Sequence, residues 1–343
     1  MQPEFTSQIP FCAVDNTTAL VDRFQRKYQY LRLSITDVCN FKCNYCLPDG
    51  YQPKADKPSF LTLSEIRRLI NAFAAMGTEK VRITGGEPTL RKDFSQIIET
   101  VRANDKIKKI ALTTNGYRMA KSVADWQAAG LDAINVSVDS LDPKMFRQIT
   151  GENLFHQVMS GIDKAFDIGY QQIKVNSVLM KGLNDRDFEA FLAWIKDRPI
   201  EMRFIELMQT GEMDHFFQRH HLSGTVLMQK LLQNGWQLQQ RAVTDGPAKV
   251  FKHADYQGSI GLIMPYSKDF CADCNRLRVS AKGLLHLCLF GEEGTNIRDL
   301  LQQDWQQAEL QHRLLSALQG KREHHYLHQG DSGVRPHLAS IGG

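Results

Sequence analysis

The sequence lacks a long hydrophobic run. None of its apolar stretches approaches the roughly 18 consecutive residues that a membrane-spanning helix needs. Residues 1–28 also lack a basic segment followed by an apolar core, which is the pattern of an export signal. These two absences predict a cytoplasmic protein without a membrane partner.

A strong excess of charge of one sign is also missing. Against 42 Lys and Arg residues stand 38 Asp and Glu residues, so the formal net charge over 343 residues is only +4. This balance argues against a nucleic-acid-binding surface and favours local anion sites. Hydrophobic residues make up 42% of the chain, which is ordinary for a globular protein.

Cysteine is scarce but clustered. In a reducing compartment, grouped thiols indicate metal ligands rather than a disulfide framework. The seven cysteines fall into two groups of three and one isolated residue. They are Cys39, Cys43 and Cys46, then Cys271, Cys274 and Cys288, and finally Cys12. We interpret Cys12 as an unremarkable free thiol in a mobile tail.

Short strands alternate with amphipathic helices over residues 30–208. Strands are expected at residues 30–36, 80–86, 109–116, 133–139, 173–180 and 201–208. The first helix illustrates the intervening pattern, because Thr62 and Glu65 form a capping-box signature and Gly77 supplies a stop. The alternation predicts a parallel sheet with right-handed crossovers. Six units make an open, partial β/α barrel related to the TIM barrel.

One face of these strands is polar. A doubly covered parallel sheet has two apolar faces, so the polar parity predicts a chamber that holds a charged or solvated ligand. The sixth strand does not follow this alternation cleanly. The polar positions are Arg32, Ser34, Thr36, Arg82, Thr84, Thr113, Asn115, Asn135, Ser137, Asp139, Lys174 and Asn176.

The character of the chain changes after about residue 210. A helix is expected within residues 222–235, a β-hairpin turning at Lys282 and Gly283, and two helices near residues 297–303 and 305–319. We expect this smaller α+β region to close the mouth of the barrel. The predicted organisation is a flexible tail (1–27), the barrel (28–210), the C-terminal region (211–330) and a tail ending in Gly-Gly (331–343).

The first cysteine group has the spacing Cys39-x3-Cys43-x2-Cys46 directly after the first strand. Three thiolates in one short loop suit three irons of a [4Fe–4S] cubane, whose fourth iron then takes a non-protein ligand. A zinc site is the alternative if a distant His or Cys completes four ligands.

The stretch TGGEPTLR follows the second strand. Gly85 and Gly86 allow a ligand to approach the backbone closely, and Glu87 offers an acceptor to an ammonium group. The glycines alone are equally compatible with a simple tight turn. Together with the cysteine loop, which carries Tyr45 before its third cysteine, they resemble the radical S-adenosylmethionine (SAM) superfamily. That resemblance implies a [4Fe–4S] cluster whose open iron binds SAM.

The second group has the spacing Cys271-x2-Cys274-x13-Cys288. A zinc site with His286 as fourth ligand is an alternative here, because His286 and Cys288 would share one face of a strand. Arg276 and Arg278 alternate beside Cys274, and two guanidiniums on one strand face can bind phosphates or carboxylates.

The combination of CxxCNRLR, GGEPTLR and a terminal Gly-Gly resembles the GTP 3′,8-cyclase family from about residue 28 to the end. The resemblance implies two [4Fe–4S] clusters, one on each cysteine group, with SAM and GTP between them. SAM would be contacted by Tyr45, Gly86, Glu87, Ser137 and Met208. GTP would be contacted by Arg32, Arg82, Thr113, Lys174, Arg276, Leu277 and Arg278. Catalytic roles are implied for Arg276, Arg278, Gly342 and Gly343.

The implied reaction is a lyase step of molybdenum cofactor biosynthesis. A deoxyadenosyl radical from SAM removes the 3′ hydrogen of GTP, and C3′ then bonds to C8. The resemblance also implies a flavodoxin- or ferredoxin-type one-electron donor, a homodimer, and transfer of the product to cyclic pyranopterin monophosphate synthase. Two alternatives remain: another radical SAM enzyme with an auxiliary cluster, such as a peptide maturase, and a non-catalytic zinc or iron–sulfur module. His324, His325 and His328 are interpreted as a solvated face.

Overall fold

Six parallel strands form the centre of the molecule. The computed structural model describes residues 19–53, 59–210, 214–240, 245–291, 294–331, 333 and 341. The central strands are β1 (Tyr30–Ser34), β2 (Lys80–Thr84), β3 (Lys109–Thr114), β4 (Ala133–Ser137), β5 (Ile173–Leu179) and β6 (Glu201–Glu206). They pair in sequence order, and β1 does not close onto β6. The predicted open six-unit barrel is therefore confirmed.

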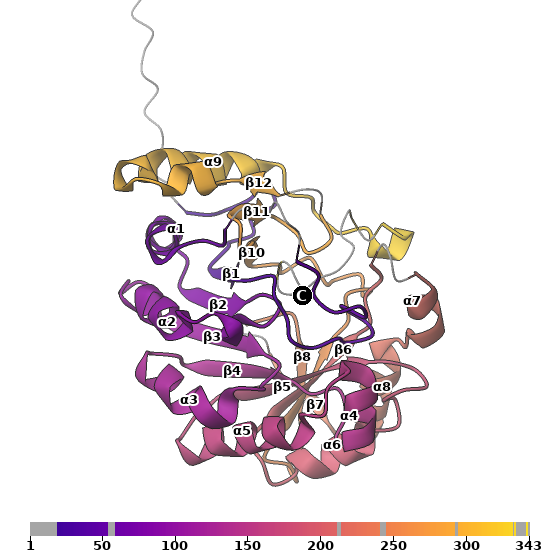
Figure 1. Cartoon of the computed structure of the whole chain (residues 1–343). Coiled ribbons are helices and arrows are strands. Elements are labelled where there is room, and N and C mark those ends of the chain that lie inside the picture. Colours follow the sequence, from indigo (N-terminus) through magenta and orange to yellow (C-terminus); the bar gives the residue numbers. More distant parts are fainter. Residues whose placement is uncertain are drawn as a thin grey trace, which may run out of the picture.

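Helices cover the outer side of this curved sheet (Figure 1). They are α1 (Leu63–Ala75), α2 (Phe94–Arg102), α3 (Met119–Ala128), α4 (Pro143–Thr150), α5 (Phe155–Asp167) and α6 (Phe188–Ile195), with a 3-10 turn η1 (Pro88–Leu90). The predicted capping box at Thr62 and Glu65 is present at the start of α1. The apolar face of α1, including Ile66 and Phe73, is buried against the sheet, as its periodicity predicts.

The C-terminal part of the chain extends both edges of the barrel sheet. Strand β9 (Ser259–Ile263) adds parallel to β6, and β10 (Arg276–Val279) adds parallel to β1. The remaining strands are β7 (Gln237–Leu238), β8 (Lys249–Lys252), β11 (Leu284–His286) and β12 (Thr295–Asn296). The described residues thus share one 12-stranded sheet. The β10–β11 pair confirms the predicted hairpin, with its turn at Lys282 and Gly283.

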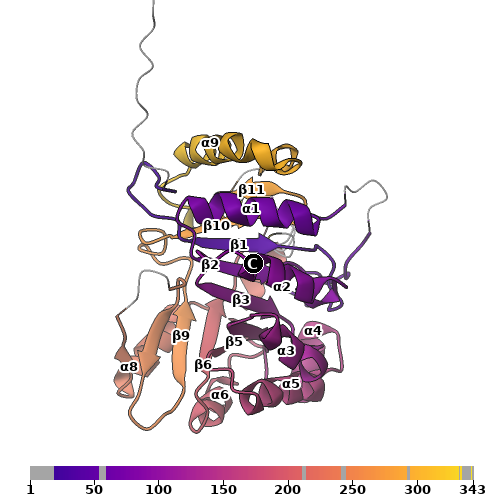
Figure 2. The same cartoon turned by 90° about the vertical axis from the view of Figure 1, so that its left-hand side faces the viewer.

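The other C-terminal elements are helical. They are α7 (Asp214–His220), α8 (Gly224–Gln233), α9 (Gln307–Gln319) and the 3-10 turns η2 (Arg298–Leu301), η3 (Asp304–Gln306) and η4 (Leu327–Gln329). Helix α9 lies beside α1 across one end of the sheet (Figure 2). The helix predicted at residues 297–303 is only the turn η2, because Gln303 and Gln306 form a capping box that starts a new turn.

Residues 19–27 are folded, which corrects the expectation of a flexible tail up to residue 27. Leu20 and Asp22 are each 2% exposed, and the backbone N–H of Leu20 donates to Met76 at 3.1 Å. A short hairpin therefore precedes β1 and packs against the barrel. Within the described residues, no helix combines the length and the apolar character that membrane crossing requires.

Candidate active site

Two adjoining cavities lie inside the barrel. The larger has a volume of about 470 Å³ and is lined by the first residue of every central strand. The smaller has a volume of about 190 Å³ and is lined by the last residues of β2, β3, β4 and β6. Four residues belong to both walls: Thr113, Asn176, Ile205 and Met208. A ligand in one cavity can therefore meet a ligand in the other at this junction.

The first cysteine group lies on the wall of the smaller cavity. Its loop follows β1 and is tied to the end of α4, because the N–H groups of Lys42 and Asn44 donate to Thr150 and Ile149 at 2.9 and 3.0 Å. Cys39, Cys43 and Cys46 are all partly accessible from the cavity. Burial raises the pKa of the Cys39 thiol to about 11.

Tyr45, in the same loop, is held by the opposite wall. Its hydroxyl donates to Asp139 Oδ2 at 2.9 Å, and Asp139 Oδ1 accepts from the N–H of Val178 at 2.8 Å. Burial raises the pKa of Asp139 to about 6, although the hydrogen bonds from Val178 and Tyr45 act to lower it. Ser137 and Met208 also line this cavity. The structure thus brings together the cysteines, Tyr45, Ser137 and Met208, as predicted.

Gly85 and Gly86 pass directly beneath the cysteine loop. Gly85 has a φ of +145°, and a Cβ atom on it would lie 2.3 Å from Thr36 O. A Cβ atom on Gly86 would lie 2.4 Å from Val38 O. Both glycines line the smaller cavity. Only residues without a side chain fit here, which explains the glycine pair by close approach of two backbone segments.

Glu87 does not lie on the wall of either cavity, in contrast to the prediction that it accepts from a ligand. It is fully buried, and its Oε1 accepts from the N–H and hydroxyl of Thr89 at 3.1 and 2.6 Å and from the hydroxyl of Thr114 at 2.8 Å. Its Oε2 accepts from the N–H of Asn115 at 2.6 Å. Glu87 therefore fixes the glycine loop to the end of β3.

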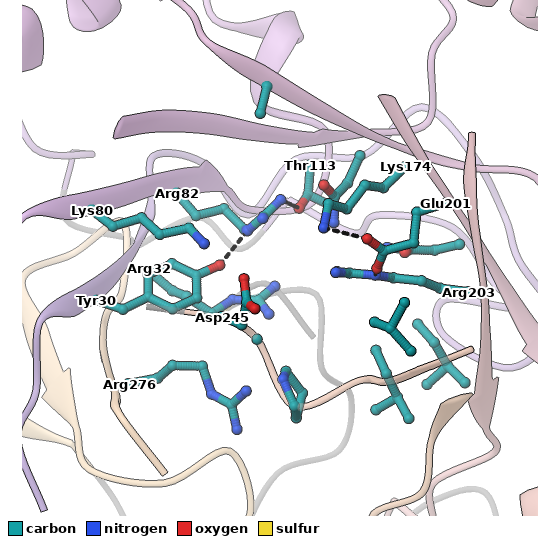
Figure 3. Close-up of a pocket in the computed structure, with 18 of the residues that line it drawn as sticks. Tyr30, Arg32, Lys80, Arg82, Thr113, Lys174, Glu201, Arg203, Asp245 and Arg276 are labelled. Atoms are coloured by element: carbon teal, nitrogen blue, oxygen red, sulfur yellow. Dashed lines mark hydrogen bonds and ion pairs between the residues drawn. The ribbon is translucent and has the colours of Figure 1, made fainter. Parts of the chain in front are cut away.

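Basic side chains dominate the larger cavity. The predicted residues that line it are Arg32, Arg82, Thr113, Lys174, Arg276 and Arg278. Figure 3 shows Arg32, Arg82 and Arg276 extending from different strands toward a common space. Arg82 Nη1 donates to Thr113 Oγ1 at 3.2 Å, and Arg82 Nε donates to the hydroxyl of Tyr30.

Sheet register places these cations in rows. Arg32 stands opposite Arg278 on one neighbouring strand and opposite Arg82 on the other. Like charges directly opposite each other destabilise a sheet unless an anion lies between them. Burial, with the nearby charge of Arg276, lowers the pKa of Arg278 to about 10. Three aligned guanidiniums have the charge and the donors that binding of a polyanion needs.

Leu277 does not face this cavity. It lies between Arg276 and Arg278 on β10, so strand alternation turns its side chain to the opposite face, where it is 1% exposed in the apolar core. The sequence resemblance placed Leu277 among the GTP contacts. The structure leaves it only its backbone for that purpose.

Further ionisable residues line the wall beyond those predicted, among them Lys80, Lys109, Glu201 and Arg203. Glu201 Oε2 accepts from Lys174 Nζ at 2.6 Å, and its Oε1 accepts from Arg203 Nε. The carboxylate therefore partly neutralises this end of the cavity (Figure 3). The sequence carries a signal for these two residues, since Glu201 and Arg203 alternate along β6, although the strand as a whole alternates less cleanly than the other five.

The second cysteine group lines the larger cavity at its β10 side. Burial would raise the pKa of Cys274, but the charges of Lys321, Arg276 and Arg26 outweigh it and lower this pKa to about 7. His286 is 6% exposed and is not on the cavity wall. The face that it was expected to share with Cys288 does not form, because β11 ends at His286.

The donor sets fit the cofactors that the motifs imply. Among the described residues, each group presents three thiols and no fourth Cys to its cavity, which is the donor set of a cubane with one open iron. In the described ranges, no group of three or more His, Cys, Asp or Glu is arranged to hold a single metal ion. On the wall of the larger cavity, Asn135 Oδ1, Asn176 Oδ1 and His325 Nε2 are buried without a hydrogen-bond partner. Such atoms mark positions for a polar ligand.

His325 corrects the interpretation of the histidine-rich segment as a solvated face. It is 7% exposed and packs edge-on against Phe270 and Phe290, with ring centroids 5.6 and 5.1 Å away. Burial lowers its pKa to about 4. His324 and His328 do not line the cavity.

The predicted roles of Gly342 and Gly343, and the interpretation of Cys12, concern positions outside the described residues. Ile341 is described, and it is 1% exposed. It packs with Leu289, Phe290 and Leu327, in a cluster that also touches Met208 and Cys288. Ile341 thus packs beside residues that line the two cavities.

Nearly the whole length of the chain is similar to known proteins. Residues 33–195 match the family model for the radical SAM superfamily, and residues 200–327 match that for Molybdenum Cofactor Synthesis C. A GTP 3′,8-cyclase of Pasteurella multocida is 70% identical over 335 residues, covering 98% of this chain and 99% of the relative. One of Haemophilus influenzae (strain PittGG) is 72% identical over 324 residues, covering 94% and 96%.

The fold has solved counterparts. The crystal structure of Streptococcus suis SuiB bound to S-adenosylmethionine superposes with a TM-score of 0.59 at 13% identity, covering 86% of this chain and 68% of that one. At this identity the likeness concerns the fold alone.

Proposed function

The chain belongs to the GTP 3′,8-cyclase family, and we propose from this membership that its larger cavity binds GTP while its smaller cavity binds SAM. The protein is a radical SAM enzyme that catalyses the first step of molybdenum cofactor biosynthesis. The observation that carries the division between the cavities is their charge: the rows of cations lie in one cavity, and the glycine loop with three cysteines lies in the other.

The superfamily uses one [4Fe–4S] cluster together with SAM, and Cys39, Cys43 and Cys46 are the residues that would hold it. When bound, that cluster would supply the electron for cleavage of SAM, and the 5′-deoxyadenosyl radical so formed would take H3′ of GTP so that C3′ could join C8, giving (8S)-3′,8-cyclo-7,8-dihydroguanosine 5′-triphosphate. We assign a second [4Fe–4S] cluster to Cys271, Cys274 and Cys288. These three cysteines line the larger cavity, so a cluster held by them would lie within reach of a guanine base there.

The arginine rows bind and orient the nucleotide. Arg278, Arg32 and Arg82 lie side by side on three strands and can take up the charge of a triphosphate. With the base near the second cysteine group and the phosphates on these guanidiniums, the ribose is left for the junction of the cavities. This arrangement confines the nucleotide before the reaction begins.

Asn176 and Thr113 are the polar residues of the junction. Asn176 Oδ1 has no hydrogen-bond partner in the structure, so it is available to a ribose hydroxyl. Met208 and Ile205 add apolar surface at the same place and exclude water from the path between C5′ of the adenosyl group and C3′ of GTP. Gly342 and Gly343 are proposed to complete this wall, since Ile341 anchors the chain beside it.

Three further proposals concern partners. A flavodoxin- or ferredoxin-type protein delivers the electron, cyclic pyranopterin monophosphate synthase receives the product, and two copies of the chain form a dimer. Within one chain, residues 28–210 serve radical generation and residues 211–330 carry the second cluster. These proposals rest on family membership alone.

Labelled substrate tests the function directly. Under anaerobic reducing conditions, deuterium at C3′ of GTP is expected to appear in 5′-deoxyadenosine, with one cyclised product formed for each SAM cleaved. Iron analysis of the reconstituted protein is expected to give about eight irons per chain, as two cubanes require. Deuterium that stays entirely in the nucleotide would refute the assignment.

A further inference from the structure

The hairpin of residues 20–28 has no part in the function described so far. Its two arms are joined by an isolated bridge between Val21 and Lys27 and by the N–H of Tyr28, which donates to Leu20 O at 2.9 Å. Gln25 turns the chain with a φ of 64°, an unusual value for a residue other than glycine. The hairpin holds this conformation because a buried carboxylate organises it.

That carboxylate belongs to Asp22, whose side chain is fully buried. Its Oδ1 accepts from the N–H groups of Phe24 and Arg26 at 2.9 and 3.0 Å. Its Oδ2 accepts from Arg26 Nε at 2.7 Å and from the hydroxyl of Tyr28 at 2.6 Å. Four donors on one carboxylate leave the Arg26 side chain a single orientation.

Arg26 then directs its remaining N–H groups at distant parts of the chain. Nη1 donates to Cys271 O at 3.1 Å and to Glu323 O at 2.7 Å, and Nη2 donates to Arg322 O at 2.8 Å. The first carbonyl belongs to a cysteine of the second group, and the other two precede His325 on the wall of the larger cavity. One guanidinium therefore joins two segments that frame that cysteine group.

The other end of the group is supported through the same hairpin. Lys321 Nζ lies 5.3 Å from the centre of the Tyr28 ring and donates to Leu287 O, the carbonyl that precedes Cys288. Lys321 is 4% exposed, so its charge acts in a buried setting. Tyr28 is itself fixed by Asp22. The hairpin thus contacts the backbone of Cys271 directly, through Arg26. It reaches the carbonyl before Cys288 only indirectly, because Tyr28 packs against the Lys321 side chain that donates to it.

We propose that the hairpin of residues 20–28 is the outer support of the second cysteine group and that Arg26 is its positioning residue. Arg26 holds the Cys271 loop at a fixed distance from residues 322–323. Together with Lys321 it places positive charge beside three sulfurs that are anionic when they bind iron. The inference rests on the proposed function, which assigns a [4Fe–4S] cluster to these cysteines.

Arg26→Gln tests this support, with Arg23→Gln as the matched control, because Arg23 is an exposed residue of the same hairpin. Mutating a residue that hydrogen-bonds to the ligands of a metal site typically lowers metal affinity by roughly 10–100-fold. We expect Arg26→Gln to lose iron from the second site by this factor under chelator challenge. Iron at the first site and SAM cleavage in the absence of GTP are expected to remain at the wild-type level, as in Arg23→Gln.

Arg26→Lys separates charge from geometry. It keeps a cation, but three N–H groups on a single nitrogen cannot replace the four hydrogen bonds that the Arg26 guanidinium makes to Asp22 and the three carbonyls. We therefore expect the iron retention of its second site to lie between that of Arg26→Gln and that of the wild type. Electron paramagnetic resonance of both centres reports which site has changed, independently of turnover. Equal iron retention, second-centre spectrum and GTP affinity in Arg26→Gln and wild type would overturn the proposal.

Loss of both centres together in Arg26→Lys would also overturn it, since the hairpin would then support the whole fold. The proposed function fails differently. If wild-type protein binds only one cluster, the assignment of the second site is wrong before any variant is made. The two ideas can therefore be rejected separately.

Discussion

The two cysteine groups occupy opposite electrostatic surroundings. Around Cys39, Cys43 and Cys46, the described lining residues include no Lys or Arg, and the carboxylates of Asp139 and Glu206 are present. Around Cys271, Cys274 and Cys288, the described lining residues include Lys and Arg from seven strands. Identical ligand atoms have thus been placed in a weakly acidic cavity and in a strongly basic one.

The difference matches the charges of the two small molecules. SAM carries a sulfonium cation and a zwitterionic amino-acid end, so basic walls would repel its reactive centre. GTP carries a polyanionic tail, which basic walls attract and hold. On the assignment proposed above, this contrast would let one barrel keep two nucleoside ligands in separate places although each lies beside a cysteine group. Four predictions test this division, from the largest effect to the smallest.

Removing one cysteine from each group should separate the two activities. Cys43→Ala is expected to reduce both SAM cleavage and GTP cyclisation to background, because radical generation needs the first cluster. Cys274→Ala is expected to abolish cyclisation while SAM is still cleaved, since we assign its cavity to the nucleotide alone. Chromatographic measurement of 5′-deoxyadenosine and cyclised product checks both. Equal loss of SAM cleavage in the two variants would end the comparison.

Arg82→Gln should affect only the basic cavity. Removing one member of a buried, hydrogen-bonded charge set costs about 2–5 kcal/mol, so GTP affinity should fall by at least ~30-fold. SAM affinity should not change, because Arg82 does not line the smaller cavity. Isothermal titration with each ligand makes the measurement. Arg67→Gln, on the exposed side of α1, is the control. Weakened SAM binding in Arg82→Gln would contradict the separation.

Tyr30 should make GTP binding sensitive to pH. Burial would raise the pKa of its phenol, but the charges of Arg82, Arg32 and Lys80 outweigh burial and lower this pKa to about 7. As the pH rises through 7, the phenol becomes a phenolate and removes positive charge from the cavity. GTP affinity should then fall in the wild type relative to Tyr30→Phe, by on the order of 1 kcal/mol.

The GTP affinities of the wild type and Tyr30→Phe are measured between pH 6 and pH 8. Because both proteins bind the same nucleotide, the titration of GTP itself cancels in the ratio of the two affinities. SAM affinity serves as the internal control, since Tyr30 does not line the smaller cavity. Parallel pH profiles for wild type and Tyr30→Phe would show that the phenol does not titrate in this range.

Tyr45→Phe should produce the smallest effect, confined to the acidic cavity. It removes the hydrogen bond to Asp139 and leaves the ring in place. A hydrogen bond to a charged group contributes about 1.5–3 kcal/mol. Only the part of this free energy that keeps the Tyr45 ring in position is expected to affect SAM binding. We expect the KM for SAM to rise severalfold while GTP affinity is unchanged. A change in GTP affinity without a change in the KM for SAM would contradict the assignment of Tyr45 to the SAM-binding cavity.

The sequence alone determined features that depend on neighbours along the chain. Cysteine spacing places three thiols in one loop whatever the rest of the fold does. Strand alternation places Arg32, Arg82 and Lys174 on the inner face, because the period of two is a property of the extended backbone. The same rule, applied strictly, predicts Glu201 and Arg203 and turns Leu277 away from the ligand.

Tertiary structure decided which residues meet across long separations. The row of Arg278, Arg32 and Arg82 exists because β10 adds beside β1 in one particular register, which no local pattern specifies. Glu87 became a structural anchor because the end of β3 supplies its donors. Arg26 reaches Cys271 across 245 positions in the chain. Such contacts depend on how sheet edges and loops pack in space, and a pattern along the sequence carries no information about that packing.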